Sequence, residues 1–419
     1  MIKTFQLSNG IPVLTELMPS LRSVSVGIWI RAGSFTENED QNGLSHFMEH
    51  MAFKGTKKHT AREMAELADC TGGELNAYTD KLCTCYYMKV VDEYLPEALR
   101  LLGEMVVSPR LDPADFEKEK GVIQEEIAMV EDSPEETIFD LLEEAAFRDS
   151  PLGRTVLGPA ERILAYHVED LLFYREKMYV PGNIAVSVAG HFDENELRDQ
   201  LENALGSLSG KGHTEYAPQR INEPPRALFL DKNISQTHMA LCYPGLPLGD
   251  KQVYDLAVLS NILGGGDSSR LFQKIREDAG LVYQIYTGPT SYPGTGEMTV
   301  YAACSPRNAS RVLDMIDQEM ESIMRTGPDE KEFERARAQL KGSFVMGLES
   351  SYNRMNALGN HYTLLGRCLS PEVTLEGINA VTIESVSALA RQLFTLPRSA
   401  AFVGKKAEKL AASVSLQPH

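Results

Sequence analysis

Two histidines with a glutamate between them are the residues whose types and spacing first suggest chemistry. They are His46, Glu49 and His50, in the run GLSHFMEHMAFK. On a helix the histidines lie about 40° apart around the axis, so both imidazoles can reach one metal ion. Glu49 lies about 60° to the other side of His46, where it can reach a metal-bound water. An ordinary amphipathic helix with a polar side is the alternative, and this motif alone does not decide between them.

A catalytic zinc ion takes three protein ligands and keeps one position open, so a third ligand is expected elsewhere. The charged run EKEKGVIQEEIAMVED, residues 117–132, offers several glutamates. Glu119 and Glu126 are seven residues apart and share one face of a helix. Most glutamates in such a run belong to a solvated surface, and residue type alone does not single out one of them.

The motifs, taken in order, resemble a known family. HFMEH is followed 126 − 50 = 76 residues later by Glu126, which is similar to the inverted zinc-binding motif of the pitrilysin-type metallopeptidases. GLSHFMEHMAFKGT, GGELNAYT and SSRLFQKIREDAGLVYQIYT closely resemble the catalytic subunit of the mitochondrial processing peptidase and its bacterial relatives. The resemblance covers nearly the whole chain.

The resemblance implies a metal site and a general base. It assigns one Zn²⁺ per chain to His46, His50 and Glu126, and the role of general base to Glu49. It assigns Glu119 to a position behind the ligands, where its carboxylate orients one of them. All five positions match the family pattern, which argues against a degenerate, non-catalytic subunit.

Four further residues are assigned to the substrate by the same resemblance. Asn76 and Ala77, in GGELNAYT, correspond to a strand that pairs with an extended peptide backbone. Arg276 and Tyr283 correspond to a pair that contacts the substrate or its tetrahedral intermediate. Residue pattern alone would favour a plain hairpin strand for the first pair, and a helix-end charge with a core tyrosine for the second.

The elements that would position these residues occur twice. In the first half the pattern predicts strands at 24–30 and 84–91 and helices at 95–107 and 113–131; in the second half it predicts a strand at 297–306, a helix at 309–324 and another from 328. FEKEKGVIQEE from Phe116 aligns with FERARAQLKGS from Phe333, an offset of 333 − 116 = 217 residues. At that offset Glu119 falls on Ala336 and Glu126 on Ser343, so only the first half carries the charged groups.

We therefore predict an α+β protein of two homologous halves, each an antiparallel sheet with helices on one side. Residues 1–205 form the metal-bearing half, 206–225 a linker rich in Gly, Ser and Pro, and 226–419 the half without metal.

Composition excludes several classes of protein. Of the 419 residues 43% are apolar and 24% charged, and the net charge is −18 without a basic block, which argues against nucleic acid. No apolar run approaches the ~18 residues of a membrane span. Six cysteines in a chain of this length do not form a disulfide framework, and no targeting segment is evident. A bacterial cytoplasmic protein is the expectation.

The predicted function is a zinc-dependent endopeptidase that hydrolyses unfolded peptides or presequence-like segments inside a chamber enclosed by a homodimer. The dimer is expected because a chain of this length has two of the four repeat units with which larger relatives surround their substrate. A non-catalytic partner or core-type subunit is one alternative, and a peptide-binding module with structural zinc is another. The intact motif argues against the first, and the presence of only three ligands argues against the second.

Overall fold

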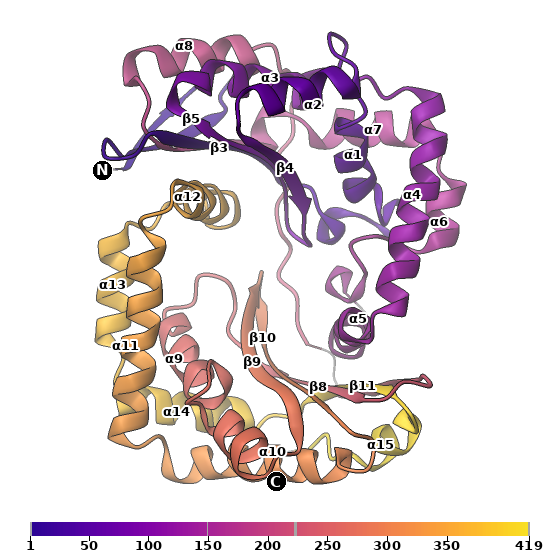
Figure 1. The fold of residues 1–419 in the computed structure, drawn as a ribbon, viewed down its shortest axis with the longest axis vertical. Coiled ribbons are helices and arrows are strands. Elements are labelled where there is room, and N and C mark those ends of the chain that lie inside the picture. The colour runs from indigo at the N-terminus through magenta and orange to yellow at the C-terminus, as the bar shows by residue number, and fades with distance from the viewer. Residues whose placement is uncertain (1, 149, 222–223, 418–419) are drawn as a thin grey trace. The chain divides into compact units, whose positions relative to one another are not determined.

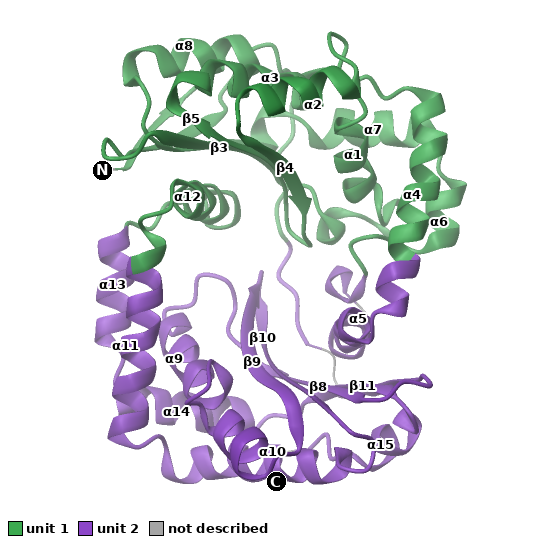
Figure 2. Cartoon of the chain, in the orientation of Figure 1, with its two compact units in different colours: residues 1–127, 155–216, 346–370 green, residues 128–154, 217–345, 371–419 purple. Residues whose placement is uncertain are grey.

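A computed structural model describes residues 2–148, 150–221 and 224–417. The chain divides into two compact units (Figure 2). Unit 1 consists of residues 1–127, 155–216 and 346–370, and unit 2 consists of residues 128–154, 217–345 and 371–419. Each unit is therefore assembled from three separate segments of the chain.

Unit 1 contains a six-stranded sheet in the order β1-β2-β6-β3-β5-β4. Its strands are β1 Ile2–Gln6, β2 Pro12–Leu17, β3 Ser23–Ile30, β4 Glu74–Thr79, β5 Thr84–Val91 and β6 Ile184–Gly190. The pair β2 and β6 is parallel, and the other pairs are antiparallel. Its helices are α1 Leu44–Ala52, α2 Ala61–Cys70, α3 Leu95–Val107, most of α4 Pro113–Asp132, α6 Ala160–Ala165, α7 Val168–Met178, α8 Glu194–Leu205 and α12 Ser351–Leu365.

Unit 2 repeats this plan with five strands in the order β7-β11-β8-β10-β9. The strands are β7 Ala227–Asp231, β8 Thr237–Pro244, β9 Val282–Tyr292, β10 Thr295–Cys304 and β11 Ser399–Gly404, with β7 and β11 parallel. Its helices are α5 Pro134–Phe147, α9 Val253–Gly264, α10 Ala309–Thr326, nearly all of α11 Glu330–Gly347, α13 Pro371–Ala380, α14 Ile383–Phe394 and α15 Ala407–Ser413. The predicted α+β class with two similar halves is confirmed, and one parallel pair in each sheet is an addition to it.

Each sheet has helices on both faces, which corrects the prediction of helices on one side. The second face is covered by a helix from the other half of the sequence, which the local pattern could not reveal. In unit 1, α12 packs on β3 and β6, on the side opposite α3 (Figure 1). In unit 2, α5 packs on β8 and β11 in the same way. The sequence repeat therefore exchanges one helix between the two sheets.

Glycine permits the close approach of α12 to its sheet. A Cβ on Gly359 would lie 1.8 Å from Nε1 of Trp29, which is fully buried on β3. The same nitrogen donates a hydrogen bond to Ser187 Oγ on β6 (2.8 Å). Any side chain at position 359 would therefore displace the helix or break this buried contact.

Candidate metal centre

Helix α1 begins at a glycine because the backbone there has a left-handed conformation. Gly43 has a φ of 98°, and a Cβ would lie 2.7 Å from the carbonyl oxygen of Leu157. The buried carboxylate of Glu37 accepts hydrogen bonds from the N–H groups of Gly43 (2.8 Å) and Ser45 (2.6 Å). Burial raises the pKa of Glu37 despite these bonds. These hydrogen bonds fix the first turn of α1, which carries His46.

The apolar face of α1 sets its position relative to α4, the other helix that carries candidate ligands. Phe47 stacks on Phe116 of α4 with ring centroids 4.4 Å apart and an interplanar angle of 3°. Both rings are fully buried in the helix-side core of unit 1. This contact fixes the register between the two helices, and their polar residues then face one another.

His46, His50 and Glu126, hereafter the ligand cluster, meet at this place within unit 1. Oε2 of Glu126 lies 3.6 Å from Nε2 of His46 and 3.4 Å from Nε2 of His50. Four ligands placed tetrahedrally 2.0–2.1 Å from Zn²⁺ are about 3.4 Å from one another. The two distances from Glu126 therefore fit one tetrahedral ion, and all three ligand atoms lie within 4.8 Å of one another. The cluster is the one group of this kind within the described ranges.

The imidazole of His50 is oriented by a chain of charges behind it. Its Nδ1 donates to Oε1 of Glu119 (2.9 Å), whose Oε2 lies 2.6 Å from the ammonium of Lys54. Burial acts to raise the pKa of Glu119, but the bonds from His50 and Lys54 outweigh it and lower that pKa. Burial likewise acts to lower the pKa of His50, but Glu119 and Glu126 raise it to about 9. The carboxylates of Glu119 and Glu126 favour a positive charge on His50. A metal ion can replace the proton that gives His50 this charge.

His46 stands in a different environment. Burial, and then the neighbouring charge of His50, lower its pKa to about 4, so this imidazole is neutral and its nitrogen can bind a metal. Its Nδ1 is buried and has no hydrogen-bond partner among the described residues. The two histidines of the motif are therefore not equivalent, because only His50 is held from behind by a carboxylate.

Glu49 is held by the strand β4. Thr79 Oγ1 donates to Oε2 of Glu49 (2.6 Å) and lies 3.1 Å from Oγ1 of Thr84 on β5. Thr84 in turn donates to the carbonyl of Ala32 (2.9 Å). Burial raises the pKa of Glu49, with the bond from Thr79 acting in the opposite direction. The result is an oriented carboxylate of increased basicity beside the ligand cluster.

The roles of Thr79 and Lys54 were not predicted from the sequence. Both residues lie inside the motifs GGELNAYT and GLSHFMEHMAFKGT. Their position within those motifs was the signal that could have indicated a role. The partners of both side chains could not be predicted, because they depend on strand pairing and helix packing.

Asn76 and Ala77 lie on β4, the last strand of the sheet in unit 1. The N–H of Ala77 donates to Oδ1 of Asn76 (2.8 Å), an exposed contact between adjacent residues. The structure thus places both residues on an edge strand, where a further strand can be added.

Arg276 and Tyr283 are brought together in unit 2. Arg276 lies in a π-helical turn, residues 272–278, and its guanidinium carbon is 5.4 Å from the ring centroid of Tyr283 on β9. Tyr283 is 75% exposed, which is unusual for a tyrosine and corrects the pattern-based view of it as a core residue. The pair therefore stands at the surface of its unit, as a pair that contacts a substrate must.

Comparison with known proteins identifies the class that this fold and this cluster define. A family model described as "Insulinase (Peptidase family M16)" matches residues 12–160, and one described as "Peptidase M16 inactive domain" matches residues 166–340. The chain belongs to peptidase family M16. The predicted resemblance is confirmed.

Particular relatives match over nearly their whole length. An uncharacterized zinc protease of Bacillus subtilis, YmxG, is 38% identical over 94% of this chain and 96% of its own. An uncharacterized zinc protease of Rickettsia felis is 32% identical over 95% and 96% of the two chains.

Solved structures show the same fold. A protease from Helicobacter pylori has a TM-score of 0.89 at 21% identity and covers 96% of this chain and 99% of its own. A chain of complex III from Candida albicans has a TM-score of 0.84 at 20% identity, with coverage of 98% and 99%.

Two further observations concern cysteines and membranes. All six cysteines are free thiols. Among the described residues, every helix is too short or too polar to cross a bilayer.

Proposed function

We propose that the chain is a zinc-dependent endopeptidase that hydrolyses extended peptides, with His46, His50 and Glu126 as zinc ligands and Glu49 as general base. The observation that carries this proposal is the convergence of the ligand cluster, whose ligand atoms lie within 4.8 Å of one another, with Glu49 next to His50 on α1. Three ligands leave a coordination position open, which is typical of catalytic and not of structural zinc. The names of the relatives support the same activity.

The residues around the ligand cluster have separate roles in peptide hydrolysis. A bound zinc ion supplies Lewis acidity and a water of lowered pKa. Thr79 occupies Oε2 of Glu49, so Oε1 remains to accept the proton of the attacking water and later to return it to the leaving amine. Lys54 and Glu119 keep Nδ1 of His50 occupied as a donor and direct its Nε2 toward the cluster.

The edge of β4 supports the choice of extended peptides as substrates. An added strand forms main-chain hydrogen bonds, which give affinity with little dependence on side chains. In the free protein Asn76 satisfies the N–H of Ala77, so a peptide must displace that carboxamide before it pairs. The net charge of −18 favours basic, presequence-like peptides among the possible substrates.

Metal content and peptide cleavage test this function directly. We expect about one zinc ion per purified chain and cleavage of an internally quenched basic peptide. A chelator should abolish cleavage, and added zinc should restore it. Zinc that is bound in full without cleavage of any peptide in a mixed-sequence library would instead identify a binding module.

We further propose a homodimer in which Arg276 and Tyr283 of one protomer complete the zinc site of the other. The exposed Arg276–Tyr283 pair belongs to unit 2, whereas the ligand cluster belongs to unit 1. A cation and a phenol beside a developing oxyanion stabilise it electrostatically. The cytoplasmic location remains a prediction.

Mixing two inactive proteins tests the shared site. One carries Glu49→Gln and the other carries Arg276→Ala with Tyr283→Phe. After subunit exchange half of the dimers are mixed, and each mixed dimer has one intact site of two, so about a quarter of the wild-type activity should return. Mass spectrometry of differently tagged chains verifies the exchange. Verified exchange without recovery would show that each chain completes its own site.

A further inference from the structure

Unit 1 contains a cavity that shares no lining residue with the ligand cluster. Its volume is about 300 Å³, and its walls come from the end of β1, the starts of β2 and β6, the last turn of α12 and the segment before β7. A volume of this size is at the small end of ligand sites. The polar side chains among the lining residues are Gln6, Arg31, Asn183, His213, Tyr362 and Thr363.

The charge of the cavity is opposite to that of the protein. The chain has 59 acidic against 41 basic residues, yet none of the described lining residues is acidic. The guanidinium of Arg31 lies 5.5 Å from the ring centroid of Tyr216 and has no hydrogen bond or carboxylate partner within the described ranges. By contrast, the buried Arg354 on α12 is paired with Glu16 at 2.7 Å. Arg31 is thus a cation that the protein leaves available at a cavity.

His213 offers a polar atom in the same wall. Its Nδ1 donates to the carbonyl of Gly182 (2.7 Å) and leaves Nε2 for another contact.

Asn183 completes the wall without offering a free group. Its Nδ2 donates to the carbonyl of Met178 (3.0 Å), and its Oδ1 accepts from the N–H of Thr214 (2.6 Å). Both bonds hold the chain on either side of the cavity, so the walls are built in advance of any ligand.

We propose that this cavity binds a small organic carboxylate through Arg31. A guanidinium presents two parallel N–H groups that match the two oxygens of a carboxylate. The carboxylate belongs either to a free organic acid or to the C-terminus of a short peptide. This binding does not depend on zinc or on Glu49, so its failure would leave the proposed peptidase function unaffected.

Calorimetric titration with succinate, the dipeptide Ala-Ala and the amidated dipeptide Ala-Ala-NH₂ tests the proposal and separates the two sources. Wild type should bind at least one of the two carboxylates and should not bind the amide. Arg31→Met should weaken that binding at least ~tenfold, since a charge-assisted pair is lost. Tighter binding of Ala-Ala than of succinate assigns the site to peptide C-termini, and the reverse order assigns it to free acids.

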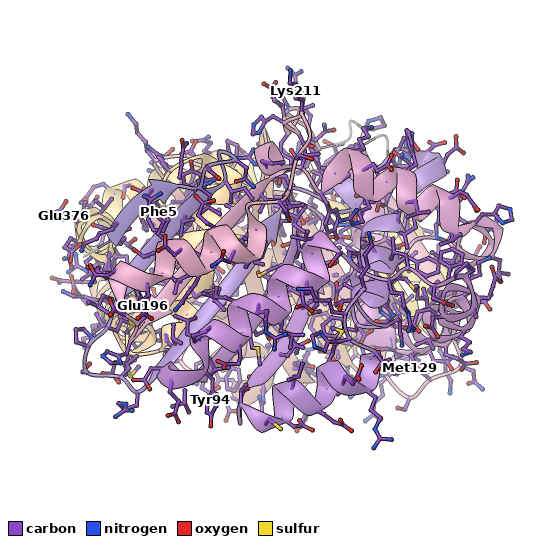
Figure 3. The ribbon with its side chains drawn as sticks, turned by 90° about the horizontal axis from the view of Figure 1, so that it is seen from above. Phe5, Tyr94, Met129, Glu196, Lys211 and Glu376 are labelled. Atoms are coloured by element: carbon purple, nitrogen blue, oxygen red, sulfur yellow. The ribbon has the colours of Figure 1, made fainter. Side chains whose placement is uncertain are left out.

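One more variant guards against general charge effects, and the ligand-free melting temperature of Arg31→Met guards against misfolding. Lys211→Met removes a cation from the same segment as His213, but Lys211 projects outward (Figure 3) and does not line the cavity, so binding should be unchanged. No binding of either carboxylate by wild type, or equal binding by Arg31→Met, would overturn the proposal.

Discussion

Replacing Glu49 with glutamine is expected to reduce kcat for peptide cleavage by about 10²–10⁴-fold while zinc remains bound. The substitution keeps the shape of the side chain and its bond from Thr79, but it removes the carboxylate that is proposed to take the proton. The ligand cluster is untouched, so zinc content should stay at the wild-type level. Initial rates and metal analysis on the same preparation measure both quantities.

Two substitutions of Thr79 test how much the orientation of Glu49 contributes to the rate. Thr79→Val removes the donor to Glu49 and should lower kcat with little change in KM, since the carboxylate loses its orientation. Thr79→Ser keeps a hydroxyl and should restore most of the rate.

If Glu49→Gln retained wild-type activity, the general base would lie elsewhere; if it lost zinc together with activity, Glu49 would be a ligand.

Glu126→Gln is expected to lower zinc affinity at least ~100-fold. This is a larger effect than usually follows the loss of a residue that only hydrogen-bonds to a metal ligand. An amide is a poor zinc ligand, and two histidines alone bind weakly. The matched control is Glu125→Gln, because Glu125 is exposed on the same helix and lies about 100° away around its axis. That control should bind zinc like the wild type. Equilibrium dialysis against buffered zinc measures both affinities.

Circular dichroism distinguishes loss of a ligand from loss of the fold, since both variants should keep the helical signal of the wild type. Equal loss of zinc in the two variants would mean that α4 presents a different face to the cluster than the one fixed by Phe47 and Phe116.

Local patterns predicted much of this site. The spacing of His46 and His50 predicted a shared face on a helix, and α1 spans Leu44–Ala52. The predicted helix at 95–107 is observed as α3 Leu95–Val107, because its apolar residues recur at helical spacing. The selection of Glu126 over its neighbours came from the family resemblance, and the structure gives the physical reason in the stacking of Phe47 on Phe116.

What the sequence did not predict depends on contacts between distant segments. The bond from Thr79 to Glu49 requires β4 to pair with β5 at the sheet edge, and no periodicity encodes that register. The packing of α12 against Trp29 joins residues more than 300 positions apart in the chain. An amphipathic pattern predicts that a helix covers some sheet, but not which of two similar sheets it covers.

The exchange of α12 has a consequence for protein synthesis. All six strands of unit 1 and its helices through α8 exist once Leu205 has been translated, but α12 ends at Leu365, 365 − 205 = 160 residues later. At ~5–20 residues per second the ribosome needs roughly 8–30 s for that stretch. Throughout this interval the nascent chain carries the complete ligand cluster on α1 and α4, while the Trp29 face of its sheet is not yet covered by α12. The first half of the message thus encodes the ligand cluster, and α12, encoded near the end of the message, lets that half finish folding.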